Sequence, residues 1–96
     1  MPPAARVGDD HACPRVDPGA RPHVGGPIQP PGCPQVRIGG KAAARAGDKA
    51  ECQVFPDVIA EGSPTVLIGG KPAARVGDRT APGGVIVSGE PSVLMG

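Results

Sequence analysis

An eight-residue stretch that occurs three times constrains the fold of this chain more than any other feature. Its copies span residues 2–9, 41–48 and 71–78, and the last reads Lys-Pro-Ala-Ala-Arg-Val-Gly-Asp. All three keep the core Arg-x-Gly-Asp. A chain that repeats one pattern can stack its copies and bury an interior that no single copy could bury. This regularity argues against the disorder that 16 glycines and 14 prolines in 96 residues would otherwise indicate.

A second repeated block, with alternating apolar residues, follows each octapeptide. The blocks span residues 32–40, 62–70 and 89–96 and carry Val-x-Ile, Val-x-Ile and Val-x-Met. Alternation between glycine-rich turns predicts a short, half-buried strand in each block. The Gly-Gly pairs of the first two blocks predict tight hairpins that lead into the next octapeptide. Val58-Ile59 and residues 85–87, which precede two of the blocks, are expected to be the partner strands.

Together these patterns predict a single all-β domain, residues 1–96, built from three units of about 1–40, 41–70 and 71–96. We expect a pseudo-threefold body in which each unit forms one wall, because closure protects strand edges. No window has a convincing helical period, so we expect little or no helix; the Ala-rich residues 41–46 are too short to persist as one. A pseudo-threefold monomer also has the right shape to cap a true threefold partner.

Charge and composition exclude several classes of function. Ten Lys and Arg against nine Asp and Glu, with Phe55 as the only aromatic residue, do not suit a nucleic-acid-binding protein. No apolar run approaches the ~20 residues that span a bilayer. Because no signal-peptide pattern opens the chain, we expect a cytoplasmic protein unless another machine exports it.

The thin core predicts a metal cross-link, for which Cys and His are the candidate ligands. Cys13 and Cys52 each follow the Asp of an octapeptide by four residues, and the third equivalent position is Pro82. In a pseudo-threefold body these positions converge at one end, here called the apex, and His11 and His23 fall in the same segment. Cys33 aligns instead with Ser63 and Glu90 in a turn block, and we expect a surface or half-buried thiol there.

The repeated Arg and Asp are predicted to be scaffold. The guanidinium forks and carboxylates should tie adjacent turns together, and the glycine between them should allow the bend. The six residues are Arg6, Arg45, Arg75, Asp9, Asp48 and Asp78.

The sequence resembles that of the PAAR-repeat proteins over essentially the whole chain. Pro-Ala-Ala-Arg stands at residues 3–6 and 72–75, a degenerate copy at 42–45, and Gly-Gly-Val-Ile at 83–86. The resemblance implies a small cone of short strands that caps and sharpens the trimeric VgrG spike of the type VI secretion system, one tip per trimer. Such a tip aids membrane puncture and effector delivery, touches the target membrane only transiently, and is exported from the cytoplasm by the secretion system.

The resemblance also implies a zinc ion near the apex, held in the family by three histidines and one cysteine. By similarity the ligands here are His11, His23 and Cys52. Pro82 departs from the family pattern because proline cannot bind a metal. Cys13 or water could fill the fourth position, or the metal could be absent; of these we favour Cys13 or water.

Two other functions remain open. An open fourth position could belong to a small zinc-dependent hydrolase or effector, with Glu51 beside Cys52 as general base. A chain this small has little with which to build the pocket that an enzyme needs. A disordered linker or metal-buffering peptide is disfavoured by the register of the three units.

Overall fold

The computed structural model describes residues 2–12, 16–17, 21–22, 25–52, 56–81 and 83–95. Every helix or strand assigned within these ranges is a β-strand, which confirms the expected all-β fold. The described residues include no helix long and apolar enough to cross a membrane. The strands are β1 (Pro3–Ala4), β2 (His11–Ala12), β3 (Val16–Asp17), β4 (Arg21–Pro22), β5 (Cys33–Ile38), β6 (Lys41–Ala43), β7 (Lys49–Ala50), β8 (Asp57–Ile59), β9 (Leu67–Ile68), β10 (Lys71–Pro72), β11 (Arg79–Ala81), β12 (Gly84–Ile86) and β13 (Glu90–Leu94).

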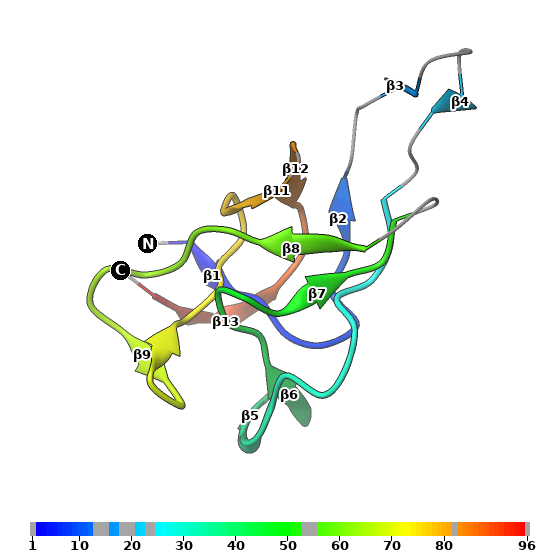
Figure 1. Ribbon diagram of the computed structural model, residues 1–96. Helices are drawn as coiled ribbons and strands as arrows, with labels where there is room; N and C mark the ends of the chain where they lie inside the picture. Colours follow the sequence, from blue (N-terminus) through cyan, green and yellow to red (C-terminus); the bar gives the residue numbers. More distant parts are fainter. Residues whose placement is uncertain are drawn as a thin grey trace.

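Five strands form a curled antiparallel sheet in the order β2-β12-β11-β8-β7 (Figure 1). Residues 26–28 connect its two outer strands. Asp10, next to β2, bridges to Pro27, and Ile28 bridges to Ala50 of β7. The sheet and residues 26–28 therefore close on themselves, and we call this assembly the strand ring.

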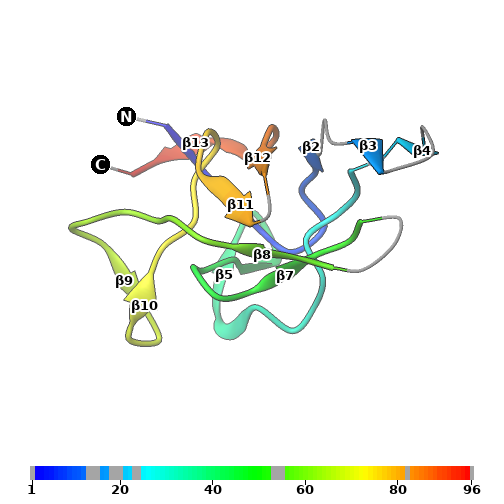
Figure 2. The same cartoon turned by 45° about the horizontal axis from the view of Figure 1, so that its top comes forward.

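Three two-stranded pairs, here called the basal strand pairs, lie next to the strand ring: β5 with β6, β9 with β10, and β13 with β1. The first two are hairpins whose turns are the Gly-Gly pairs, with φ of 58° and 82° at Gly39 and Gly40 and 58° and 80° at Gly69 and Gly70. Positive φ at both turn residues is the geometry that glycine tolerates best. The third pair joins the two ends of the chain, which lie close together in Figures 1 and 2.

The basal strand pairs correct one prediction about strand pairing. Val58-Ile59 and residues 85–87 were expected to pair with the Val-x-Ile segments, but β8 and β12 pair within the strand ring. The Val-x-Ile strands instead pair with the start of the octapeptide, as in Ile38 with Lys41 and Ile68 with Lys71. The first three residues of the Ala-rich segment 41–46 form strand β6.

Three alanines of the octapeptides meet in a closed triangle of backbone hydrogen bonds. Ala5 N–H donates to the Ala74 carbonyl at 2.9 Å, Ala74 N–H to the Ala44 carbonyl at 3.0 Å, and Ala44 N–H to the Ala5 carbonyl at 3.1 Å. One bond comes from each octapeptide, so the triangle marks a pseudo-threefold axis. Alanine fits here because all three side chains are buried where the strands come close together.

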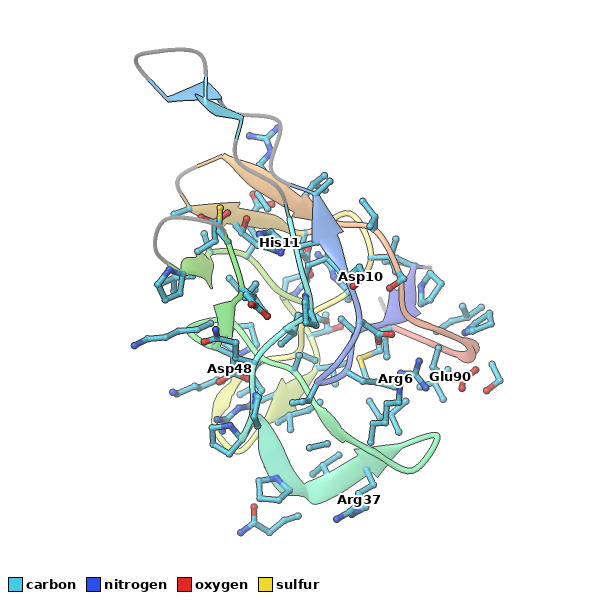
Figure 3. All side chains as sticks on the ribbon, turned by 90° about the vertical axis from the view of Figure 1, so that its right-hand side faces the viewer. Arg6, Asp10, His11, Arg37, Asp48 and Glu90 are labelled. Atoms are coloured by element: carbon cyan, nitrogen blue, oxygen red, sulfur yellow. The ribbon has the colours of Figure 1, made fainter. Side chains whose placement is uncertain are left out.

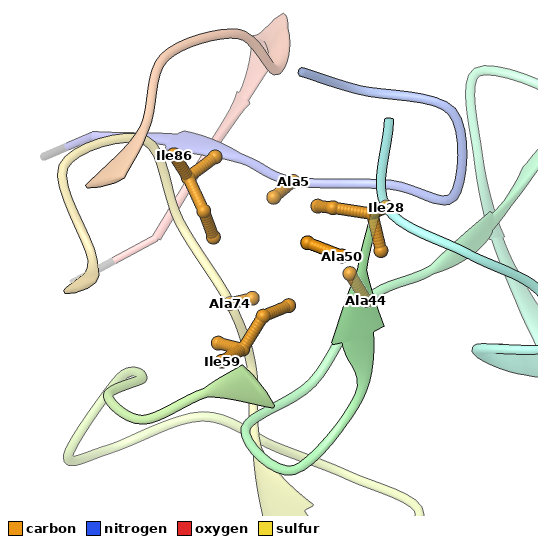
Figure 4. Packing of buried hydrophobic residues seen from close by; sticks show 7 residues of the cluster. All are labelled: Ala5, Ile28, Ala44, Ala50, Ile59, Ala74 and Ile86. Atoms are coloured by element: carbon orange, nitrogen blue, oxygen red, sulfur yellow. The ribbon is translucent and has the colours of Figure 1, made fainter. Parts of the chain in front are cut away.

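The buried residues form two layers along this axis. The first layer lies inside the strand ring and consists of Ala5, Ile28, Ala44, Ala50, Ile59, Ala74 and Ile86 (Figure 4). The second layer lies among the basal strand pairs and consists of Ala4, Cys33, Ile38, Ala43, Ile68 and Ala73, with Val66, Val93 and Met95 packed against it. Most side chains in both layers sit at repeat-equivalent positions, such as Ile28, Ile59 and Ile86.

The Arg-x-Gly-Asp turns have the predicted scaffold geometry. In each turn the Asp carboxylate accepts a hydrogen bond from the Arg backbone N–H, at 2.8, 2.8 and 2.7 Å in chain order. The Arg side chain also donates to the same carboxylate, which holds the pKa of Arg6 and Arg75 above the ordinary value. The Gly of each turn has φ of 93° or 94°, so a side chain there would be strained.

Candidate functional site

The apex residues predicted as metal ligands are only partly within the described ranges. His11 lies on β2, and Cys52 is a buried residue two positions beyond β7. Cys13, His23 and Pro82 lie outside the described residues. In Figure 3 β3 and β4 lie at one end of the molecule and Arg37 of β5 at the other, with His11 between them.

Both ring nitrogens of His11 have partners inside the strand ring. Nδ1 lies 2.9 Å from the Gly26 carbonyl oxygen, and Nε2 lies 3.1 Å from Asp57 Oδ2. The His11 side chain is 0% exposed and that of Asp57 is 1% exposed. Because a carbonyl oxygen can only accept, Nδ1 carries a proton that it donates to Gly26. His11 is thus held on two sides, by the Gly26 carbonyl and by the Asp57 carboxyl group.

Asp57 is the centre of this buried polar group. Its Oδ2 also accepts a hydrogen bond from the Thr80 hydroxyl at 3.1 Å, whereas Oδ1 has no hydrogen-bond partner among the described residues. His11, Asp57 and Thr80 come from β2, β8 and β11, one from each predicted unit. We call these three residues the polar triad; it links three segments that are far apart in the sequence.

The polar triad occupies positions that differ between the repeats. His11 and Thr80 follow their octapeptide Asp by two residues, where the middle repeat has Ala50. Asp57 stands two residues before Ile59, where the other repeats have Gly26 and Gly84. A Cβ added to Gly84 would collide with Thr80 Oγ1 and lie 3.0 Å from His11 Cδ2. The small residues therefore make room for the larger polar ones.

Sequence reasoning did not predict Asp57 or Thr80 as partners of His11. The alignment of the repeats contained the information, because a buried strand position that alternates between glycine and aspartate marks a place where the symmetry of the core is broken. The pairing itself could not be predicted, since it joins strands that are not adjacent in the sequence.

The described residues do not by themselves form a metal site. Among them, no group of three or more His, Cys, Asp or Glu side chains is arranged to hold a metal ion. His11 is the described histidine, and both its nitrogens are engaged as above. A site at the apex would therefore depend on Cys52 together with Cys13 and His23.

Cys33 corrects a second prediction. It was expected to be a surface or half-buried thiol, but it is only 6% exposed and belongs to the core among the basal strand pairs. Its polar repeat equivalents were misleading because Ser63 is also buried, where its hydroxyl accepts hydrogen bonds from the backbone N–H groups of Thr65 and Val66.

Each basal strand pair exposes one side chain at a position that is equivalent in the three repeats. Leu67 is 64% exposed and Leu94 is 51% exposed, and the third equivalent is Arg37, also exposed. Exposed large apolar side chains favour contact with another protein where they form part of a contiguous patch. We call these three repeat-equivalent positions the base face.

Comparison with protein-family models gives one match, to the model described as PAAR motif, over residues 18–88. This range includes two of the three octapeptides and parts of the strand ring and of the basal strand pairs. No curated protein matches the chain.

Proposed function

Because this chain belongs to the PAAR motif family of spike-tip-type proteins of the type VI secretion system, we propose that it caps a trimeric VgrG spike, with one tip per trimer. The observation that carries the proposal is the hydrogen-bond triangle of Ala5, Ala44 and Ala74. A monomer with a pseudo-threefold axis offers three similar surfaces to a trimer without a symmetry mismatch.

The base face is the surface that we propose contacts the spike. It carries Leu67 and Leu94 on separate basal strand pairs, and its third position, Arg37, lies at the end of the molecule opposite β3 and β4 in Figure 3. Burial of the two leucines, which are 64% and 51% exposed, would contribute part of the about 1.5–3 kcal/mol that full burial of an exposed leucine gives. Arg37 at the third position would tolerate a polar or acidic contact.

Co-purification with the cognate spike tests this proposal. We expect a complex of one tip per spike trimer, measured by size-exclusion chromatography with light scattering. The double variant Leu67→Arg/Leu94→Arg should lose the complex while keeping the circular dichroism of the wild type. Val58→Arg is the matched control, because Val58 is an exposed valine on β8 of the strand ring. A tip that stays monomeric beside its spike, or a double variant that still binds, would contradict the proposal.

We further propose that a zinc ion cross-links the apex through Cys13, His23 and Cys52, with water in the fourth position. Zinc prefers thiolate and imidazole ligands, and a structural metal contributes folding free energy to a chain with a small core. Burial of Cys52 at the edge of the strand ring supports its inclusion. His11, the remaining expected ligand, lies with Nδ1 at 2.9 Å from the Gly26 carbonyl oxygen and Nε2 at 3.1 Å from Asp57 Oδ2.

Metal analysis of two cysteine variants tests this part. Cys52→Ser should lose zinc and melt at a markedly lower temperature, because a structural metal contributes directly to folding. Cys33→Ser should keep zinc, because Cys33 lies in the other core layer and serine already occupies its repeat equivalent at position 63. Equal zinc content in Cys52→Ser and the wild type would exclude Cys52.

A structural rather than enzymatic role is part of the proposal. A surface hollow of about 420 Å³ is lined by Gln29, Pro30, Pro31, Gly47, Asp48 and Lys49. Its carboxylate, Asp48, is already tied to Arg45. The alternative, a small zinc-dependent hydrolase or effector with an open metal position, would be favoured by hydrolytic turnover that a chelator abolishes while the fold persists.

We also propose the itinerary that this role requires. The tip would be held in the cytoplasm before firing and then exported with the spike, alone or with effector proteins, meeting the target membrane only during puncture. Immunodetection of the tip in culture medium, present in a strain with an active secretion system and absent without it, tests this itinerary.

A further inference from the structure

We infer that His11 is an internal hydrogen-bonding residue that positions Asp57 and Thr80 inside the strand ring, and that it is not a ligand of the apical metal. The inference concerns this chain's own departure from a three-histidine ligand set, and its first steps need no bound metal. It rests on the contacts of the imidazole, its burial and the construction of the layer around it.

The first step is the position of protons on the imidazole. Nδ1 lies 2.9 Å from the Gly26 carbonyl oxygen, so it must carry a hydrogen. The opposite tautomer would set a lone pair against that oxygen, and the Gly26 N–H, 3.4 Å away, is too distant to compensate well. This fixes the use of one ring nitrogen.

The second step is the other nitrogen, Nε2, which faces Asp57 Oδ2 at 3.1 Å. Two arrangements satisfy this contact. Either Nε2 carries a proton and donates it to a carboxylate, or Asp57 carries the proton on Oδ2 and donates it to Nε2. In both arrangements the pair is neutral overall, and a metal ion could bind Nε2 only by displacing the proton shared with Asp57.

The third step is the absence of a route outward for the ring. The His11 side chain is 0% exposed, and the adjacent strand position is Gly84, where a Cβ would already lie 3.0 Å from His11 Cδ2. Turning the ring toward the apex would break two hydrogen bonds and leave the buried Asp57 with the Thr80 hydroxyl as its remaining described partner. An unpaired buried carboxylate is strongly unfavourable, so the triad holds the ring in place.

The function that follows is positional. The polar triad takes one residue from each repeat and joins β2, β8 and β11. In the sequence Cys13 follows His11 by two residues, and Cys52 follows the end of β7 by two residues. The triad would hold the strands of this sheet in place whether or not the metal is bound. This last step rests on the proposed zinc site, whereas the assignment of His11 does not.

Nuclear magnetic resonance of the full chain, labelled with ¹⁵N and loaded with ¹¹³Cd in place of zinc, tests the inference directly. The chain has only two histidines, so a His11→Gln variant assigns both imidazoles. We expect ¹¹³Cd coupling to the ring of His23 and none to the ring of His11. Coupling to His11 would overturn the inference.

The metal-free protein separates this inference from the zinc proposal. There we expect a slowly exchanging, low-field ring N–H proton from His11 and ring ¹⁵N shifts equal to those of the loaded protein. If ¹¹³Cd does not bind at all, the zinc proposal fails and the His11 proton still tests the triad. Absence of that proton in folded, metal-free protein would overturn the assignment.

Thermal melting adds a check on the coupling between triad members. His11→Gln and Asp57→Asn should each lower the melting temperature with zinc content unchanged. The double variant should lower it by less than the two single losses added together, because either change alone already disrupts the pair. Strictly additive losses, or loss of zinc in a folded His11→Gln variant, would count against the inference.

Discussion

The alanines of the octapeptide are set by the close approach of three strands at the axis. Ala5, Ala44 and Ala74 each donate and accept one bond of the backbone triangle, and each is buried. A longer side chain at any of these positions would have to push the strands apart. The two adjacent alanines of the motif therefore reflect packing rather than chemistry.

Ala44→Val tests this account at the axis. The added methyl groups overpack the layer, and we expect the free energy of unfolding to fall by about 1–3 kcal/mol in urea denaturation. Ala42→Val, two residues earlier and only half buried, is the control and should change stability by no more than about 0.5 kcal/mol. Equal stability of the two variants would show that the axis has room to spare.

At this scale the sequence predicted the scaffold residues well and the polar core poorly. The Arg-x-Gly-Asp turns are local, since the Arg N–H and Asp carboxylate lie three residues apart, and local geometry can be inferred from composition. The contact between His11 and Asp57 depends on how the strand ring closes, which residue types alone do not determine. The burial of Cys33 was missed for a related reason, because a polar repeat equivalent satisfied within its own turn looks like a surface position.

Among the elements, the pair formed by β1 and β13 differs from the two hairpins because Glu90 has replaced the residue equivalent to Cys33 and Ser63. Its carboxylate accepts hydrogen bonds from the Ser92 N–H at 3.1 Å and the Ser92 hydroxyl at 3.0 Å. These bonds, and then the Arg6 guanidinium 3.4 Å away, hold the pKa of Glu90 below its ordinary value of 4.5.

The lowered pKa of Glu90 predicts how stability changes in acid. A carboxyl group that ionises more easily when folded stabilises the fold above its unfolded pKa, and the contribution disappears as the pH falls through the lower folded value. The difference in stability between wild type and Glu90→Gln should thus be constant above about pH 4.5 and shrink below it. Urea denaturation between pH 2.5 and 6 measures this difference; a difference that grows on acidification would contradict the assignment.

The positions of most strands and turns could be predicted because glycine and proline mark their limits, whereas their partners could not. The Gly-Gly turns correctly indicated the two hairpins. β8 and β12 were assigned to the wrong neighbours, since a short apolar strand fits many partners and the strand ring selects among them through contacts between repeats.

On the scale of the whole molecule, the three basal strand pairs share the same pairing register. Ile38 pairs with Lys41 and Ile68 with Lys71, while the equivalent Met95 N–H donates to the Pro2 carbonyl at 2.9 Å. Two residues separate each hairpin pair, and the two chain-end residues, Gly96 and Met1, occupy the corresponding positions in the sequence. The three basal strand pairs therefore have the register of a cyclic repeat.

A circular permutant tests this equivalence. Gly96 is joined to residue 1, changed by Met1→Gly, and new ends are opened between Gly39 and Gly40. We expect the permutant to fold with the circular dichroism of the wild type and a single cooperative unfolding transition. A second permutant, opened between Val58 and Ile59 within β8 of the strand ring, should not fold cooperatively. Failure of the first permutant, or equal success of the second, would contradict the equivalence.

The backbone triangle also governs when folding can finish. Its corners at Ala5, Ala44 and Ala74 come from all three octapeptides, and β1 pairs with β13, at nearly the full length of the chain. Contacts between residues so distant in sequence raise the contact order and slow the search for the native state. The first octapeptide leaves the ribosome before the other two and lacks its final partners until the residues of the third octapeptide and of β13 have been made.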